Sequence, residues 1–329
     1  MDSIKYSFII PVKEINNYIR ESVPNILDIP RDDYEIIIYP DRKSDYEWPK
    51  TRQIETGPGG PAMKRGLAQR DANGDFLIFI DDDAYPRKDI LDVLDKDFEN
   101  ENIAAVGGPA LTPESDSFLQ KVSGAVYLSH LSGGFPERYA PIGKKRFISD
   151  WPTVNLTIRK NVFESVGGFN SNFWPGEDTK LCLDIIDKLD RKNMILYDPK
   201  VIVWHHRREG LERHLKQIAG YGLHRGYFAK KFPKTSFRFP YFIPTFFLLF
   251  VIFGPIISYF FPIFLKLYIL GWIIYGLAMI KVVFDIKRYQ KEFSVAFYSL
   301  TYVFLTHIVY GARFIQGFVF TKNLKSKLR

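Results

Sequence analysis

The sequence predicts an α/β domain with a mostly parallel central sheet, followed by a C-terminal helical membrane region. Short apolar runs alternate with helical patterns along residues 6–80, which is typical of a layered α/β fold. Residues 239–265 form a run of 27 residues without a charge, and a membrane-spanning helix needs about 20. A chain of 329 residues is long enough for both parts.

The overall composition is that of a folded protein that does not depend on cysteine. Apolar residues make up 46% and charged residues 25%, which excludes a disordered chain. The single cysteine, Cys182, excludes a disulfide framework and a cysteine-based zinc site. We expect Cys182 to be a small buried apolar residue on a helix.

The excess positive charge is confined to the C-terminal part of the chain. Residues 239–329 carry ten Lys and Arg against two Asp and Glu, which accounts for the whole net charge of +8. They also hold 25 of the 53 aromatic residues. Basic residues beside long apolar runs indicate membrane lipid as a partner and argue against nucleic acid.

Alternating elements predict the sheet. Ser7–Val12 and Glu35–Tyr39 are short apolar runs that predict buried strands, and Asn17–Leu27 between them has a helical pattern. A strand, a helix and a second strand in this order form a parallel pair with a right-handed crossover. Asp75–Ile80 predicts a third strand of the same kind, preceded by a helix over Ala62–Ala72.

Acidic residues follow two of these strands, where ligands bind in parallel sheets. Asp41 lies in the turn after the second strand, and Asp81, Asp82 and Asp83 follow the third. Three adjacent carboxylates repel one another unless a cation neutralises them. The cluster therefore suggests a Mg²⁺ or Mn²⁺ site that binds a diphosphate, with a solvated acidic turn as the alternative.

Two further groups of polar residues have the residue types of a catalytic site. Glu177 and Asp178 open a predicted helix over Thr179–Leu189, where one carboxylate could act as a general base or both could simply favour the helix dipole. His205 and His206 follow a predicted strand over Val201–Trp204, and two arginines come next. Such a group could supply a metal ligand and compensate phosphate charge.

These motifs occur together in one known family. The chain resembles the family 2 glycosyltransferases with the GT-A fold, specifically members with a C-terminal membrane anchor. The resemblance covers nearly all of residues 5–238. It depends on the order of these motifs: Ile9-Ile10-Pro11-Val12, Asp41, Gly74-Asp75, Asp81-Asp82-Asp83, Asn155-Leu156, Gly167-Gly168-Phe169, Gly176-Glu177-Asp178 and His206.

The resemblance implies a role for each matching residue. Asp178 is similar to the family's catalytic base, with Glu177 as the alternative. The implied metal ligands are Asp81, Asp83 and His206. The implied donor-binding residues are Pro11, Val12, Asp41, Lys64, Asp81, Asp82 and Asp83. For Lys64 and its neighbour Arg65 a solvated helix face is the other interpretation. We expect the acceptor or phosphate region to include Trp174, Gly176, Arg207, Tyr221 and Arg225.

The implied reaction is an inverting transfer of a sugar from a nucleotide-diphosphate donor, with Mn²⁺ or Mg²⁺ as cofactor. Gln217 is not followed by the Arg-Trp pair of processive synthases, which favours a single addition. We expect a lipid-linked glycan or polyprenyl phosphate acceptor in cell-surface polysaccharide or glycoconjugate synthesis. The alternative is a non-catalytic subunit that binds sugar nucleotides in a glycan-assembly complex, and a homo-oligomer is compatible with either function.

The membrane region completes the predicted organisation. We expect a cytoplasmic domain over residues 1–238, ending in an interfacial helix over Leu211–Phe232, and a membrane region over residues 239–329. The start of the chain has no signal-peptide pattern. The hydrophobic segments are 239–265, 267–284 and 293–320.

Basic residues before the first segment and around residues 285–292 place both stretches in the cytoplasm of a cell-membrane protein. The sequence leaves two arrangements for the third segment. If the segment spans, the basic C-terminus lies outside; otherwise the segment re-enters the membrane or lies in the interface. A soluble helical domain is the weaker alternative for the whole region.

Overall fold

The computed structural model describes residues 3–169, 173, 175–189 and 194–324. Its contacts divide the chain into two compact units. Unit 1 comprises Met1–Pro113 and Ala140–His206, and unit 2 comprises Glu114–Tyr139 and Arg207–Leu324. The boundaries of these units differ from those of the predicted domains 1–238 and 239–329. The reason is that residues 114–139 and 207–238 pack with the apolar helices.

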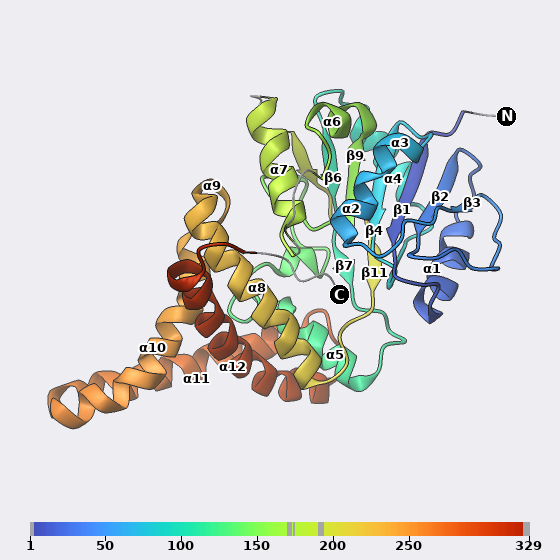
Figure 1. Ribbon diagram of the computed structural model, residues 1–329. Coiled ribbons are helices and arrows are strands. Elements are labelled where there is room, and N and C mark those ends of the chain that lie inside the picture. The colour runs from blue at the N-terminus through green and yellow to red at the C-terminus, as the bar shows by residue number, and fades with distance from the viewer. Residues whose placement is uncertain (1–2, 170–172, 174, 190–193, 325–329) are drawn as a thin grey trace. The chain divides into compact units, whose positions relative to one another are not determined.

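The predicted parallel core of unit 1 is confirmed (Figure 1). Strand β1 (Tyr6–Pro11) lies between β2 (Tyr34–Tyr39) and β4 (Phe76–Ile80) and pairs in parallel with both. Helix α1 (Asn17–Leu27) has the predicted bounds, and the side chain of Asn16 caps its first turn by accepting from the backbone N–H of Ile19.

The complete sheet is mixed, with most neighbours parallel. Its eight strands run in the order β3-β2-β1-β4-β9-β6-β10-β8, and β9 and β8 are antiparallel to their neighbours. A second sheet has the order β5-β11-β7. The bounds are β3 Thr51–Gln53, β5 Ala84–Pro86, β6 Ala105–Gly107, β7 Ala110–Leu111, β8 Arg146–Ile148, β9 Asn155–Arg159, β10 Ile195–Tyr197 and β11 Val203–His205.

The helix predicted over Ala62–Ala72 is present as two pieces, α2 (Pro61–Gly66) and α3 (Ala68–Asp71). The break follows Gly66, and glycine is the least favourable helix residue after proline. The other helices of unit 1 are α4 (Ile90–Phe98), α6 (Lys160–Ser165) and α7 (Glu177–Lys188).

Helices cover both faces of the sheet. Successive strand residues point to opposite faces, so Phe8 packs with the apolar side chains of α1 and α4, whereas Ile9 packs with those of α6 and α7. The strands are buried on both sides, as the continuous apolar runs predict. Cys182 is a fully buried residue of α7, as expected.

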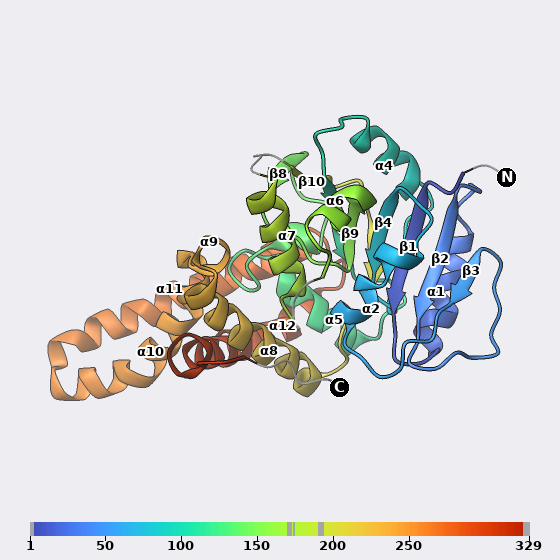
Figure 2. The same ribbon diagram turned by 45° about the horizontal axis from the view of Figure 1, so that its top comes forward.

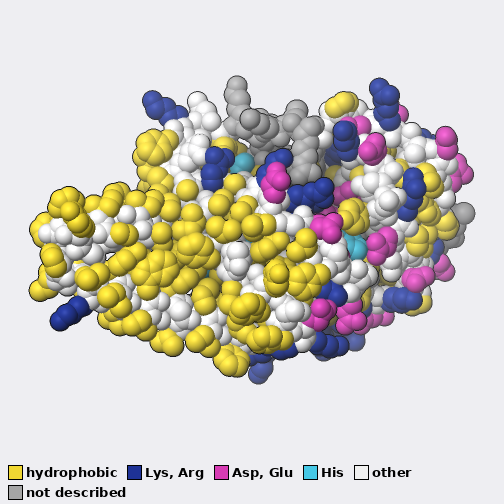
Figure 3. Space-filling model, turned by 90° about the horizontal axis from the view of Figure 1, so that it is seen from below, with side chains coloured by type: hydrophobic (Ala, Val, Ile, Leu, Met, Phe, Trp, Pro, Cys, Tyr) yellow, Lys and Arg dark blue, Asp and Glu magenta, His cyan; other side chains and the backbone are white. Residues whose placement is uncertain are grey.

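Unit 2 is helical. Its elements are α5 (Phe118–Ala125), turns at Val126–Leu128, Pro136–Arg138 and Pro262–Phe264, α8 (Leu211–Lys231), α9 (Pro233–Ser236), α10 (Phe239–Phe260), α11 (Leu265–Lys287), α12 (Phe293–Ile315) and a π-helical turn at Gln316–Phe320. Phe239–Phe260, Pro262–Lys287 and Phe293–Phe320 are long and apolar enough to cross a membrane, with mean hydropathies of 2.1, 2.0 and 1.4. Helices α10 and α11 form a hairpin (Figure 2), and apolar side chains dominate the face of it that Figure 3 shows.

The internal segment 114–139 joins these apolar helices. Helix α5 and the turn after it contribute Val122, Ala125 and Val126 to a buried cluster that is completed by residues of α11 and α12. The Ser129 hydroxyl donates to Asp285 of α11 at 2.8 Å. This segment of the predicted cytoplasmic domain is therefore packed as part of the helical unit.

Candidate active site

The ends of β1 and β2 bring together four residues of the predicted donor site. Lys64 on α2 donates to the backbone oxygen of Val12, directly after Pro11, at 2.5 Å and forms an ion pair with Asp41. The side chain of Lys64 is only 2% exposed. Lys64 is therefore a buried cation at the end of the strands, and a solvated helix face is the wrong interpretation of it.

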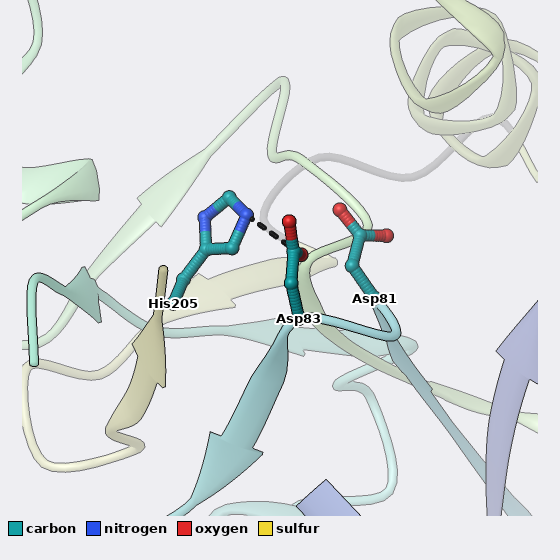
Figure 4. Close-up of side chains that lie close together, drawn as sticks. All are labelled: Asp81, Asp83 and His205. Carbon is teal, nitrogen blue, oxygen red and sulfur yellow. Dashed lines mark ion pairs between the residues drawn. The ribbon is translucent and has the colours of Figure 1, made fainter. Parts of the chain in front are cut away.

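Three side chains that could hold a metal ion lie at the end of β4 and on β11 (Figure 4). Asp81, Asp83 and His205 each offer one ligand atom, and these atoms lie within 4.8 Å of one another. His205 Nε2 lies 3.1 Å from Asp83 Oδ1. Two carboxylates and an imidazole suit Mg²⁺ or Mn²⁺, so the donor set fits the implied cofactor.

The neighbouring histidine, His206, lies elsewhere. Its Nε2 is 3.1 Å from a carboxylate oxygen of Glu21, and its ring packs 5.0 Å from that of Tyr18. Strand β11 extends to His205, beyond the predicted end at Trp204, and His205 lies opposite Ala84 of β5. Since side chains alternate along a strand, only the first histidine faces the carboxylates.

Asp82 is also turned away from this group. Its carboxylate accepts from Asn16 Nδ2 at 2.7 Å, and Asn16 is the residue that caps α1. Of the three adjacent aspartates, the first and third therefore face His205, while the second contacts the start of a helix.

Arg65 connects the carboxylate cluster to α7. Its guanidinium forms an ion pair with Asp81 and a second one with Glu177 at 2.9 Å. The side chains of Arg65 and Glu177 are both buried. Burial raises the pKa of Glu177, the neighbouring charge of Asp178 raises it further, and Arg65 opposes both effects. No local pattern around Arg65 indicates these partners, because they come from distant elements.

Asp178 is the more accessible carboxylate of the pair that opens α7. It is half-buried and accepts from the backbone N–H of Thr179 at 2.7 Å, whereas Glu177 is only 5% exposed. The preceding Gly176 has a φ of 113°, a conformation that side chains other than glycine rarely adopt. The turn therefore starts α7 abruptly and exposes Asp178 at its first turn.

The expected acceptor region is distributed over both units. Gly176 belongs to unit 1, and Trp174 lies outside the described residues. Arg207, Tyr221 and Arg225 belong to unit 2.

The two arginines of this group lie against aromatic rings. The guanidinium of Arg207 lies 5.0 Å from the ring centre of Tyr139, and that of Arg225 lies 4.7 Å from the ring centre of Tyr241. Arginine on an aromatic face keeps its charge.

Comparisons with known proteins identify similar enzymes. Residues 7–159 match the family described as Glycosyl transferase family 2. The chain is 26% identical over 247 residues to dolichyl N-acetyl-alpha-D-glucosaminyl phosphate 3-beta-D-2,3-diacetamido-2,3-dideoxy-beta-D-glucuronosyltransferase of Methanococcus voltae, a match that covers 68% of this chain and 74% of that protein. It is also 27% identical over 164 residues to the pre-mycofactocin glycosyltransferase of Mycobacterium tuberculosis, which covers 50% of this chain and 33% of the relative.

The fold has a counterpart among solved structures. A mannosyltransferase from Pyrobaculum calidifontis in complex with GDP-Man and Mn²⁺ superposes with a TM-score of 0.52 at 16% identity, over 96% of this chain and 87% of that one. The expected GT-A fold is thereby confirmed. Residues 7–159 match a glycosyltransferase family 2 domain, and the chain is an enzyme of the transferase class.

Proposed function

We propose that this protein is a metal-dependent, inverting and non-processive glycosyltransferase of the cytoplasmic face of the cell membrane. It moves a sugar from a nucleotide-diphosphate donor to a lipid-linked acceptor in cell-surface polysaccharide or glycoconjugate synthesis. The observation that carries the proposal is the convergence of Asp81, Asp83 and His205 at the end of β4, in the unit that contains Asp178.

The donor site is assigned from this geometry. Lys64 holds Asp41 and the end of β1 in place beside the edge of the sheet where nucleotides bind. Asp81, Asp83 and His205, rather than His206, would hold the divalent ion, which when bound neutralises the diphosphate leaving group.

The proposed base is Asp178. Its carboxylate is accessible at the start of α7 and takes the proton of an acceptor hydroxyl as the acceptor oxygen attacks the anomeric carbon. Glu177 is engaged with Arg65 and buried, so it serves as a partner of that arginine instead. A single attack from the face opposite the nucleotide inverts the anomeric centre and needs no covalent intermediate.

The acceptor is proposed from the relative of Methanococcus voltae and from the apolar helices. The name of that relative specifies a dolichyl-linked sugar phosphate as the acceptor. Three helices that could cross a membrane would hold this chain beside such a lipid. The proposed boundary between the extramembrane and membrane parts remains at residues 238 and 239.

The first experiment measures thermal stability of the detergent-purified full chain with Mn²⁺ and UDP, GDP or dTDP in turn. A nucleotide at a hundredfold excess over its Kd stabilises the folded state by roughly 2.7 kcal/mol. We expect a metal-dependent rise in melting temperature with one nucleotide, and no rise in the Asp83→Ala variant. A folded sample that responds to none of the three would favour a subunit without a donor site.

The second experiment separates an enzyme from a sugar-nucleotide-binding subunit of an assembly complex. We expect Asp178→Asn to bind the nucleotide like the wild type but to lose transfer by a factor of about 10²–10⁴, the contribution of a general base. A variant with full transfer activity would contradict the assignment for hydroxyl acceptors. A phosphate acceptor is already ionised near neutral pH and would show a much smaller loss.

A further inference from the structure

The third apolar helix, α12, meets α10 in an unexpected order. Phe304 and His307 pack on Phe247 of α10, with ring centres 5.9 and 5.8 Å away. Further along α12, Phe314 packs on Phe242, which lies earlier in α10, at 4.8 Å. The two helices are therefore antiparallel where they touch.

A third spanning helix would need the opposite order. Helices α10 and α11 form an antiparallel hairpin, since Phe250 packs on Tyr268 at 4.9 Å and Phe247 on Tyr275 at 4.4 Å. Helix α11 therefore ends at the level where α10 begins, and α12 starts there. To cross the membrane from that level, α12 would have to run parallel to α10.

The end of α12 instead returns to the level where it started. Phe318 lies in the π-helical turn after α12. Its ring centre is 5.6 Å from that of Phe242 and 6.2 Å from that of Phe237, which precedes α10. The deepest of these contacts along α10 is at Phe247, eight residues or about 12 Å from its first residue at 1.5 Å per residue. That is less than half of a hydrocarbon core of about 30 Å.

Along its whole length, helix α8 lies beside α12 or the turn that follows α12 (Figures 1 and 2). His214 Nε2 lies 2.9 Å from Thr306 Oγ1 near the start of α8, and Lys230 donates to the backbone oxygen of Thr321 at 2.7 Å near its end. Between these points a Cβ on Gly226 would come within 2.2 Å of the backbone oxygen of Phe314, so the two backbones are in close contact.

The composition of α8 excludes it from the hydrocarbon core. It carries Glu212, Arg213, Lys216, Arg225, Lys230 and Lys231 on 21 residues. Charged residues inside a bilayer are costly, whereas a helix with basic and apolar sides is stable at the interface. Because α12 runs beside α8 from Tyr302 to the turn that follows α12, this part of α12 cannot lie across the core while α8 stays at the surface.

The burial of α12 agrees with this position. One third of its most apolar window is buried in the protein, against 6% for each of the other two segments. Val295, Ala296, Ser299, Val303, Thr306, Gly311 and Phe314 form its buried side. Its exposed side carries Phe293, Phe297 and Tyr298, which suits contact with lipid.

We propose that α12 and α8 lie as a pair in the membrane interface, so that the chain crosses the bilayer only twice, through α10 and α11. The partner of the exposed side of α12 is the lipid interface. The C-terminus then lies on the side where α10 begins, and Lys322, Lys325, Lys327 and Arg329 follow the positive-inside rule.

Cysteine labelling in membrane vesicles of both orientations tests this topology. The full chain has one cysteine, buried Cys182, so Cys182→Ser gives a background without a reactive thiol. Single cysteines are placed at exposed positions: Ile263 between α10 and α11, Tyr289 between α11 and α12, Asn323 after α12, and Lys88 in unit 1 as the reference. A membrane-impermeant maleimide reports the side of each.

We expect Tyr289→Cys, Asn323→Cys and Lys88→Cys to react from the same side and Ile263→Cys from the other. Labelling of Asn323→Cys from the side of Ile263→Cys would mean that α12 spans, and would overturn the proposal.

The depth of a probe in the bilayer gives a second, independent test of the topology. An environment-sensitive fluorophore on Leu305→Cys, near the middle of the segment 293–320, should be quenched more by shallow than by deep nitroxide lipids, whereas a spanning α12 would place it deep in the core. Its partner position is Ile274→Cys, on the exposed side of α11. That position should show the reverse order of quenching. Equal insertion of both probes into the core would contradict an interfacial α12. Neither readout depends on sugar transfer, so the topology can fail while the proposed enzyme stands.

Discussion

Each unit of the molecule has a polar cluster that joins three elements, and the two clusters differ in charge. In unit 1 the ionic cluster, Arg65, Asp81 and Glu177, connects α2, the end of β4 and α7. In unit 2 the neutral cluster, Ser123, His214 and Thr306, connects α5, α8 and α12.

The difference follows the surroundings of each cluster. The ionic cluster borders the proposed donor site, and its arginine neutralises the neighbouring carboxylates. The neutral cluster lies among apolar helices, and burial lowers the pKa of His214 to about 4, so its imidazole is uncharged at neutral pH.

The largest effect on stability is expected when the ionic cluster loses its cation. Arg65→Met leaves Glu177 buried beside Asp178 without a compensating charge, and breaking a buried ion pair in this way costs about 3–5 kcal/mol. The melting temperature of the purified full chain measures this loss.

The matched variant is Arg65→Met combined with Glu177→Gln. The second change removes the unpaired buried carboxylate, so it should restore part of the stability lost in the single variant. If both variants melt at the same temperature, the charge of Glu177 is not what the arginine compensates.

The neutral cluster should make the protein sensitive to acid. The folded pKa of His214, about 4, lies below the unfolded value of 6.5, so between these values the unfolded chain binds more protons. Stability from this group is complete above pH 6.5 and falls as the pH drops through the window, by roughly 3 kcal/mol at pH 4.

The measurement compares wild type with His214→Gln, which keeps hydrogen-bonding groups but does not titrate. The wild type should lose more stability than the variant between pH 6.5 and pH 4. If stability falls equally with pH in both proteins, the imidazole is already charged in the folded protein. The cluster of unit 2 would then not be neutral.

A smaller loss of stability is expected when a side chain is added where α8 packs on α12. Gly226→Ala places a Cβ within 2.2 Å of the backbone oxygen of Phe314, and overpacking of this kind costs about 1–3 kcal/mol. The control is Gly220→Ala on the same helix, where nothing lies within 4 Å and alanine favours the helix by up to about 1 kcal/mol. Opposite shifts in melting temperature are expected, and equal shifts would contradict close packing of α8 on α12.

The local part of the fold could be predicted from the sequence. Continuous apolar runs gave the bounds of β1, β2 and β4 to within one residue, and α1 was predicted without error. These elements depend on nearby residues, because period and capping are local. Asp41, Asp81 and Asp83 could be placed at strand ends for the same reason.

The parts that could not be predicted depend on contacts between distant residues. His205 and His206 are adjacent, and a strand end one residue later decides which of them faces the carboxylates. Lys64 and Arg65 resemble a solvated helix face until Asp41, Asp81 and Glu177 arrive from other elements. The packing of α5 on helices more than 150 residues later in the chain had no local signal.

That separation has a consequence during translation. Val126 and Val303 belong to one buried cluster but are 177 residues apart, which corresponds to roughly 10–35 s at about 5–20 residues per second. Throughout that interval the apolar face of α5 has emerged from the ribosome and its partner helices have not. A fragment that stops at residue 238 would keep this face uncovered permanently, so the catalytic unit is expected to be soluble on its own only if residues 114–139 are also removed or repolarised.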